Sequence, residues 1–491
     1  MKKLLGTFTV GMIAACASAV TNYVDCSMSD YTGHDGSSWA KAFKTIQEGV
    51  DAANAGDTIL VAPGDYDEGG KKDTLSNGGL SNRVFIAQKS ITIKSTGGAA
   101  VTRIIGQRDP STLNSGTVCP GLGANAVRCI CVLANNASET PVIEGFTIAD
   151  GATADGGDTV KTKGGGVFTC NTSGTYMFFC DLVDCVVTNC IANNAGGVDG
   201  GRCIRCRIED CDAMATEAAS RHASMFSCLI VRNGRLSGRP AVGYVFNGST
   251  NGVIVNCTFA GNGGAALDSF PGTVRNCIFS ENGDASFKTD STGNYITSFG
   301  NCLVQPNGSI PSGSTGCVKP SNNLQLFAPA VGDYRLLPTS LAVAAGDPAA
   351  LELFPEQYRD KDFDGNPRKT GNTVNMGCYE TLAPAPEGGA VFFSFPAKVN
   401  GHVGCCSGLH AYSANYPEMF DVSVAPQAHT NETLYFCGNN ADGGLIPNSI
   451  RWYPKWDDER IGLLTPTSSF YRVDRAVATK TLWVKCPFIA R

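Results

Sequence analysis

A short motif that begins with cysteine recurs through the middle of this 491-residue chain and limits its fold more than any other feature. In each copy an apolar residue follows the cysteine two places later, and a polar turn residue comes soon after. The cysteines of the copies are Cys185, Cys206, Cys228, Cys257, Cys277 and Cys302. Alternate residues of a strand share one face, so the cysteine and the apolar residue point the same way. Copies that begin 20 to 29 residues apart predict a solenoid of stacked parallel coils.

Stacking of the coils predicts that equivalent cysteines form a column inside the solenoid. Cys190 and Cys211 mark a second column position, again 21 residues apart. The Asn or Asp that closes each motif suits a turn, because it tolerates left-handed backbone geometry. The predicted fold class is therefore all-β, as a right-handed parallel β-helix.

A solenoid needs covered ends, because an open coil would pair with other chains. Apolar residues recur at helical spacing after Ser37 and Ser38, either of which can cap a helix. They are Trp39, Phe43, Ile46, Val50 and Ala53. We expect a short amphipathic helix that caps the first coil, and an entry strand within residues 56–66.

These features resemble secreted bacterial β-helix proteins of the pectin-lyase-like fold. This resemblance rests on residues 35–66, 164–168 and 256–259. A second resemblance, to the terminal module of the choice-of-anchor Q group, rests on the segments 333–336, 344–347, 364–368 and 376–380. Together the two resemblances imply a β-helix with its cap over residues 20–323 and a terminal module over 324–382. They imply no single activity, because such proteins include polysaccharide lyases, glycosidases and adhesins.

The amino terminus has the layout of a secretory leader. Lys2 and Lys3 precede a short apolar stretch, and Ala17-Ser18-Ala19 offers a cleavage site, which predicts a signal peptide over residues 1–19. An alternative stays open, because residues 13–16 also resemble a lipoprotein box that would place lipid on Cys16. Either way we expect a secreted or cell-surface protein that meets a membrane only through that lipid.

Charge and composition narrow the partners. The formal net charge is −6 and no basic run is present, which argues against nucleic acid as a partner. Abundant glycine, at 58 residues, suits many tight turns. For an exported β-helix of this kind we expect a monomer whose partner is a polysaccharide or a glycan surface.

The familiar catalytic patterns of the resembling enzymes are absent. Neither the polygalacturonase motifs nor the Arg-x-Pro-x-x-Arg signature of pectate lyases occurs in the chain. A local charge concentration remains, with Arg205, Arg207 and Glu209 predicted to point outward, and Asp212 and His222 in the loop that follows. Such a group could hold an acidic sugar and abstract a proton. The alternative is a solvated face with exposed ion pairs that contribute little.

One segment has the spacing that opens a calcium loop. Its candidate ligands are Asp360, Asp362, Asp364 and Asn366, with Gly365 at the sharp turn. Gly371 stands where such a loop needs a glutamate. Calcium and a plain polar turn therefore both remain open. Cys203 and Cys206 form a lone C-x-x-C pair, a weak signal for zinc or redox chemistry beside a plain role in the column.

The cysteines divide into two predicted groups. We expect those of the column to be free, because they behave as small apolar residues and stacked parallel neighbours have poor disulfide geometry. Disulfides are expected outside the column, in an oxidising compartment. The candidates are Cys119 with Cys129, Cys170 with Cys180, and the set Cys405, Cys406, Cys437 and Cys486.

After residue 382 the repeat ends. Residues 383–389 are a linker by composition, and alternating apolar stretches in 390–491 predict a small β-sandwich-like domain of no recognised family. Trp452, Tyr453 and Trp456 could form a platform on which a sugar stacks, and core packing is the alternative.

Together these observations predict a secreted or cell-surface β-helix protein that engages complex polysaccharide, with acidic polysaccharide as one candidate. Two alternatives remain: a non-catalytic structural or adhesive surface protein, and a polysaccharide lyase with a non-standard site. Catalysis therefore stays undecided at this point.

Overall fold

A computed structural model describes most of the chain up to residue 380. It covers residues 19–380 except for 76–78, 158, 175–178, 244–251, 285–286, 288–297, 322–324 and 330–331, and beyond them residue 382 and several strands. The leader up to residue 18, with Cys16, and the linker 383–389 lie outside the described residues. The chain divides into two compact units, the first composed of Met1–Val253, Asn262–Gly272 and Phe287–Ile296, and the second of the remaining segments.

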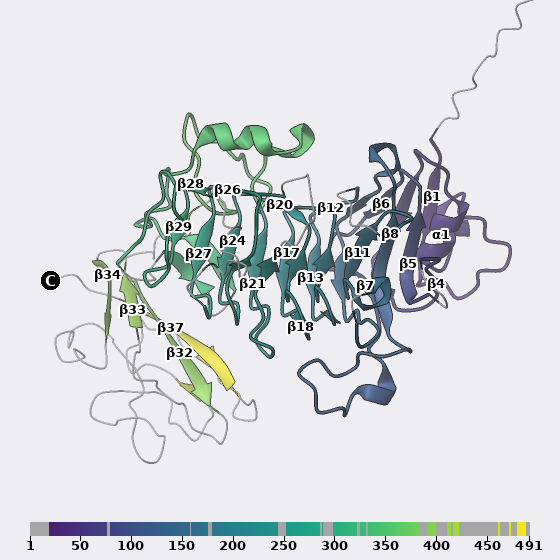
Figure 1. Ribbon diagram of the computed structural model, residues 1–491, viewed down its shortest axis with the longest axis horizontal. Helices are drawn as coiled ribbons and strands as arrows, with labels where there is room; N and C mark the ends of the chain where they lie inside the picture. Colours follow the sequence, from purple (N-terminus) through teal and green to yellow (C-terminus); the bar gives the residue numbers. More distant parts are fainter. Residues whose placement is uncertain are drawn as a thin grey trace, which may run out of the picture. The chain divides into compact units, whose positions relative to one another are not determined.

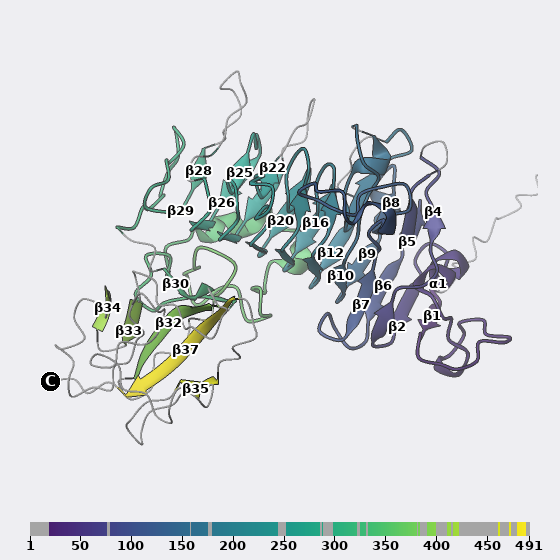
Figure 2. The same ribbon diagram turned by 90° about the horizontal axis from the view of Figure 1, so that it is seen from below.

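The first unit is a parallel β-helix, which confirms the predicted fold class (Figures 1 and 2). Each coil contributes one strand to each of three sheets, called A, B and C here. In spatial order, sheet A contains β1 (Thr21–Val24), β2 (Thr58–Val61), β6 (Thr92–Ser95), β9 (Val142–Glu144), β12 (Asp181–Val183), β16 (Arg202–Ile204) and β20 (Ser224–Phe226). Sheet B contains β3 (Gly64–Tyr66), β7 (Thr102–Ile105), β10 (Thr147–Ala149), β13 (Val186–Thr188), β17 (Arg207–Glu209) and β21 (Leu229–Val231).

Sheet C follows sheet B in each coil. It contains β4 (Lys71–Lys72), β5 (Ser81–Ala87), β8 (Val127–Leu133), β11 (Val167–Cys170), β15 (Val198–Asp199), β19 (Ser220–Arg221), β22 (Val242–Gly243) and β25 (Leu267–Asp268). All its pairings are parallel except that of β4 with β5. A short extra pair, β14 (Ile191–Ala192) with β18 (Asp212–Ala213), lies between sheets B and C along the chain.

The corner between sheets A and B explains the cysteine repeat. One residue with positive φ turns the chain there, and the next residue is a buried cysteine. In the first unit these pairs are Asp184 with Cys185, Arg205 with Cys206, and Ser227 with Cys228. The Cys206 thiol donates to the carbonyl oxygen of Leu182 in the preceding coil, at 3.2 Å. A small side chain that donates weakly thus fits the crowded inside of each corner.

The corner between sheets B and C differs from the prediction in one respect. Asn189 and Asp210 have positive φ, as expected of the turn residue, and Cys190 and Cys211 follow them inward. In the next coil, however, Arg232 takes the positive φ and Asn233 is wholly buried. Asn233 and Asn262 therefore continue the column of Cys190 and Cys211, and the amide replaces the thiol.

The cap begins later than predicted. Trp39–Lys41 forms a short 3-10 helix, and the α-helix α1 spans Ile46–Ala52. Thr45 caps α1 through a capping box with Glu48, so neither Ser37 nor Ser38 starts it. Phe43 instead forms a parallel backbone bridge with Val24, the last residue of β1. Ile46 and Val50 are buried as expected, whereas Trp39 is 41% exposed.

The first two predicted disulfides are corrected, because Cys119, Cys129, Cys170 and Cys180 are all free and buried. Cys129 points into the coil, where its thiol donates to the carbonyl oxygen of Ala149 at 3.1 Å. Cys119 packs instead in a separate apolar cluster with Leu122, Ala126, Ala152 and Ile191. Cys170 lies on the outer side of sheet C, and Cys180 precedes sheet A. Cys405, Cys406 and Cys437 lie outside the described residues, as does the side chain of Cys486.

Every one of the seventeen described cysteines is a free thiol. Under denaturing, non-reducing conditions we expect a thiol reagent to titrate at least these, and far fewer in the native protein. Burial raises the pKa of Cys131 to about 12, so the reactive thiolate is scarce in the fold. Spectrophotometric titration before and after denaturation checks this, with pre-reduced protein as the reference. Fewer than seventeen thiols in the denatured sample would contradict the free column.

The second unit contains further strands of the coils and residues 324–382, the segment predicted to be a terminal module and called the module from here on. β24 (Thr258–Ala260), β27 (Ile278–Ser280) and β29 (Leu303–Val304) pair in parallel, as do β26 (Thr273–Arg275) and β28 (Phe299–Gly300). β23 (Val253–Val255) contains the boundary between the units. The module contributes the antiparallel pair β30 (Leu326–Ala328) with β31 (Asp333–Leu336), and two 3-10 helices, η6 (Pro348–Leu353) and η7 (Glu356–Tyr358).

Asparagines at the corners of the second unit bind the module. Asn256, Asn276 and Asn301 have positive φ and precede Cys257, Cys277 and Cys302. Their amides donate to module carbonyls: Asn276 to Asp347 at 2.9 Å, and Asn301 to Ala345 at 3.1 Å. Asn276 Oδ1 also accepts from the Asp347 amide at 2.8 Å. The corner residues thus turn the coil and fasten the module to it.

Beyond residue 382 the structure describes only strands. β32 (Ala390–Lys398) pairs antiparallel with β33 (His410–Ser413) and β37 (Thr479–Pro487), and β34 (Tyr416–Asp421) pairs with β33. A separate pair joins β35 (Arg460–Ile461) and β36 (Tyr471–Arg472). Trp452, Tyr453 and Trp456 lie outside the described residues, so the predicted stacking platform stays a prediction.

Candidate functional site

The predicted outward charges lie on sheet B and its two corners. Ile208 faces inward, in register with Val187 and Ile230, so Arg207 and Glu209 on either side of it face outward. Arg205 occupies the first corner and pairs with Asp184 of the preceding coil, at 2.7 and 2.9 Å. Its side chain is only 9% exposed, so it points outward less freely than predicted.

Ion pairs also join the second corner to sheet B. Glu209 Oε2 accepts from Arg207 Nε and from Arg232 Nη2, both at 2.6 Å. Arg232 also holds Asp210 of the preceding coil, at 2.7 Å. We call Asp184, Arg205, Arg207, Glu209, Asp210 and Arg232 the corner network. Most members are partly exposed, so they are ion-paired yet reachable from solvent.

Asp212 does not join the other candidates. It is buried, and its carboxylate accepts from the Leu236 amide at 2.9 Å and from the Ser237 hydroxyl. It therefore secures the loop between β21 and β22.

His222 lies apart from the corner network, at the end of β19 in sheet C. Its Nδ1 is 2.8 Å from Asp199 Oδ1 of the preceding coil, and both side chains are almost wholly buried. Beside them, Arg221 Nε lies 3.5 Å from Glu217 Oε2. We call Asp199, Glu217, Arg221 and His222 the buried charged cluster. Among the described residues, Asp199 Oδ2 has no hydrogen-bond partner.

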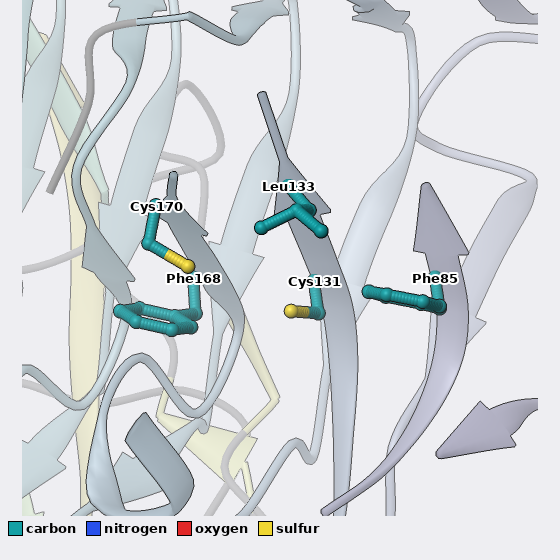
Figure 3. Close-up of a cluster of buried hydrophobic side chains, with 5 residues drawn as sticks. All are labelled: Phe85, Cys131, Leu133, Phe168 and Cys170. Atoms are coloured by element: carbon teal, nitrogen blue, oxygen red, sulfur yellow. The ribbon is translucent and has the colours of Figure 1, made fainter. Parts of the chain in front are cut away.

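The register of sheet C explains how this cluster arises. Its strands place one residue per coil on a shared outer row, in the order Phe85, Cys131, Phe168, Asp199, Arg221, Gly243 and Asp268. The first three belong to an apolar cluster with Leu133 and Cys170 (Figure 3). The row then changes from apolar to charged. Gly243 has no side chain, which leaves the space that Glu217 Oε1 fills.

The buried charged cluster has the components of proton transfer. A histidine held by a carboxylate is a candidate general base, and an arginine can pair with a substrate carboxylate. Burial raises the pKa of Glu217, although the neighbouring Arg221 lowers it. Buried charges of this kind are costly, and perturbed groups of this kind often mark functional sites.

The predicted calcium loop is corrected to a polar turn. Asp362 Oδ1 accepts from the amides of Asp364 and Asn366, at 3.0 and 2.8 Å, and Oδ2 accepts from the Glu380 amide at 2.8 Å. The carboxylate of Asp362 thus satisfies backbone amides, and the backbone carbonyl of Asp360 accepts from Arg368. In the described part of the chain, no three His, Cys, Asp or Glu side chains gather in a way that could hold a metal ion. Cys203 and Cys206 therefore belong to no such group, and both side chains point into the coil.

Comparisons with known proteins find only distant structural similarity. No family model matches the chain, and no curated protein does. Among solved structures, the pectate lyase Pel9A has a TM-score of 0.37 at 13% identity, over 74% of this chain and 97% of that one. The pectin methylesterase PemA from Erwinia chrysanthemi has a TM-score of 0.26 at 13% identity, over 60% and 74%. At such low scores the assignment of fold rests on the chain's own strand pairings.

Proposed function

We propose that this chain binds complex polysaccharide along the outer face of sheet B. The observation that carries the proposal is the corner network, in which a carboxylate of one coil pairs with a guanidinium of the next coil at both corners of sheet B. Parallel strands lie about 4.8 Å apart, so a polymer along the coil axis would meet charged groups on neighbouring coils at this part of the surface. Each guanidinium has five N–H donors, and its ion pairs use only some of them. The rest suit sugar hydroxyls.

A double variant, Arg207→Ala with Arg232→Ala, tests this surface. We expect its affinity for the bound polysaccharide to fall about tenfold, ~1.4 kcal/mol, because charged hydrogen bonds are lost. A glycan array first finds the ligand, and calorimetric titration then compares the variants. Arg202→Ala is the matched control, because Arg202 pairs with Asp181 on the outside of sheet A. Unchanged binding in the double variant, or an equal loss in the control, would remove the proposal.

Polysaccharide lyase is a second candidate function, favoured by the buried charged cluster. With the buried charged cluster opened to the polymer, His222 would abstract the proton beside a uronate carboxylate held by Arg221, the glycosidic C–O bond would break, and Glu217 would protonate the leaving oxygen. The same glycan panel, read by ultraviolet absorbance of unsaturated products, separates the cases. Turnover that disappears in His222→Gln supports a lyase, and binding without turnover supports an adhesive or structural surface protein.

We also propose export, with residues 1–19 as the leader. The leader-like pattern supports it, and lipid on Cys16 is the alternative. In the described part of the chain, no helix is both long and apolar enough to span a bilayer. Mass spectrometry of the mature amino terminus distinguishes cleavage after Ala19 from lipid attachment at Cys16.

A further inference from the structure

The terminal module contains a half-open hollow of about 400 Å³ that none of the sites described above uses. Pro348 and Leu351 of η6 line one part of it, and Pro367 lines another. These side chains provide apolar wall without hydrogen-bonding groups. Such a surface suits the C–H face of a ring better than it suits a small inorganic anion.

Basic groups line the same hollow. Arg359 Nη1 is 3.0 Å from Glu352, and Arg359 Nη2 is 3.8 Å from Glu356. Those two carboxylates are 75% and 88% exposed, so their ion pairs with Arg359 are weak and exchangeable. Lys369 is exposed, and among the described residues it has no ion-pair partner. Arg359 and Lys369 can therefore pair with a carboxylate that enters the hollow.

A third basic residue, Arg368, lines the hollow and is fixed in place. Its side chain is wholly buried, and its Nη1 donates to the carbonyl oxygen of Cys378 at 3.0 Å. Nη2 donates to the carbonyl oxygens of Asn256 and Gly377. Nε is buried and has no hydrogen-bond partner among the described residues. The buried carboxylate of Glu380 lies 3.4 Å from Nη1 and offsets the charge, so Arg368 fixes the wall of the hollow, and Arg359 and Lys369 supply its accessible positive charge.

Acceptors complete the lining. The carboxylates of Glu352 and Asp360 are exposed at the hollow and can accept hydrogen bonds from hydroxyl groups. An inorganic anion has no use for these acceptors, and a neutral sugar has no use for the basic groups. A sugar acid needs the apolar wall, the acceptors and the cations together.

We propose that this hollow binds one uronic acid residue of an acidic glycan, with Arg359 and Lys369 holding its carboxylate. The site goes beyond the proposed polysaccharide surface on sheet B and shares no residue with it. It would give the terminal module its own sugar specificity. The module would then select uronic acid residues of the glycan, and the outer face of sheet B would bind a neighbouring stretch of the polymer.

Binding of single sugars to the full chain tests the proposal. Saturation-transfer NMR and calorimetric titration would compare glucuronate and galacturonate with their neutral methyl esters, and with inorganic phosphate. We expect at least one of the two acids to bind at least tenfold more tightly than its ester and than phosphate. Equal binding of each acid and its ester, equal binding of phosphate, or no binding of either acid would overturn the proposal.

Variants locate the site. Arg359→Gln combined with Lys369→Gln should weaken binding of the acid at least tenfold, whereas Lys361→Gln, a lysine of the same module outside the hollow, should not change it. Thermal melting verifies that each variant is folded. The variant Arg207→Ala with Arg232→Ala should keep its affinity for the single sugar acid even where it loses the polymer. Loss in Lys361→Gln, or no loss in the double variant of the hollow, would refute the assignment.

Discussion

Replacement of Asn233 by alanine is expected to lower the free energy of unfolding by about 3 kcal/mol. Asn233 is wholly buried, and its Oδ1 accepts from the Cys211 amide at 3.1 Å. Its Nδ2 donates to the carbonyl oxygens of Ile208 and Val231, at 2.9 and 3.1 Å. Alanine would leave these backbone groups buried without a partner, which is far costlier than loss of the side chain itself.

Denaturant unfolding followed by circular dichroism measures the effect. Asn54→Ala is the control, because Asn54 is exposed and its substitution should cost less than about 0.5 kcal/mol. Asn233→Cys should recover part of the loss, since the two preceding coils place Cys190 and Cys211 at the equivalent position. Equal stability of Asn233→Ala and the wild type would show that the amide column contributes nothing.

The second large effect concerns pH and the terminal module. Burial raises the pKa of Glu380 to about 7, although Arg368, at 3.4 Å, lowers it. In the unfolded chain, Glu380 has the ordinary glutamate pKa of about 4.3. The folded state therefore binds the proton of Glu380 more tightly than the unfolded chain does. The stability that this proton contributes is complete below about pH 4 and is lost as the pH rises through about 7. We expect the second unit to lose on the order of 3 kcal/mol between these limits.

Unfolding free energies at pH 5 and pH 8 check this expectation. Glu380→Gln removes the titrating group, so the difference between the two pH values should shrink by about half or more. Glu352→Gln, which changes an exposed carboxylate of the same module, should leave the difference as in the wild type. A second unit whose stability rises from pH 5 to pH 8 would contradict the expected sign.

The fold was predictable because stacking repeats one local rule in every coil. Cys185, Cys206 and Cys228 follow the same turn, so their spacing alone indicates parallel coils. The role of Asn233 was not predictable, because an asparagine can either adopt positive φ or bury its amide. Only the neighbouring Arg232, which takes the positive φ, distinguishes the two.

The buried charged cluster was only half visible in the sequence. Glu217, Arg221 and His222 lie close together along the chain, and His222 was a candidate there. Asp199 was missed because it sits in a glycine-rich stretch without an evident pattern. The available signal was distance along the chain, because Asp199 and His222 are 23 residues apart, close to one coil. The calcium-like spacing of Asp360, Asp362 and Asp364 misled for the opposite reason, because spacing does not reveal which carboxylate already bonds to backbone amides.

The free thiols inside the coils have a consequence for how this protein is made. An exported chain would meet oxidants before its last coil is wound, and any pair of unwound cysteines could then be joined wrongly. Repeat structures grow coil by coil, so each completed turn would withdraw its thiols from that chemistry. Successful biogenesis would then depend on winding faster than oxidation, and slower mutants would be lost as crosslinked chains although their finished fold is stable.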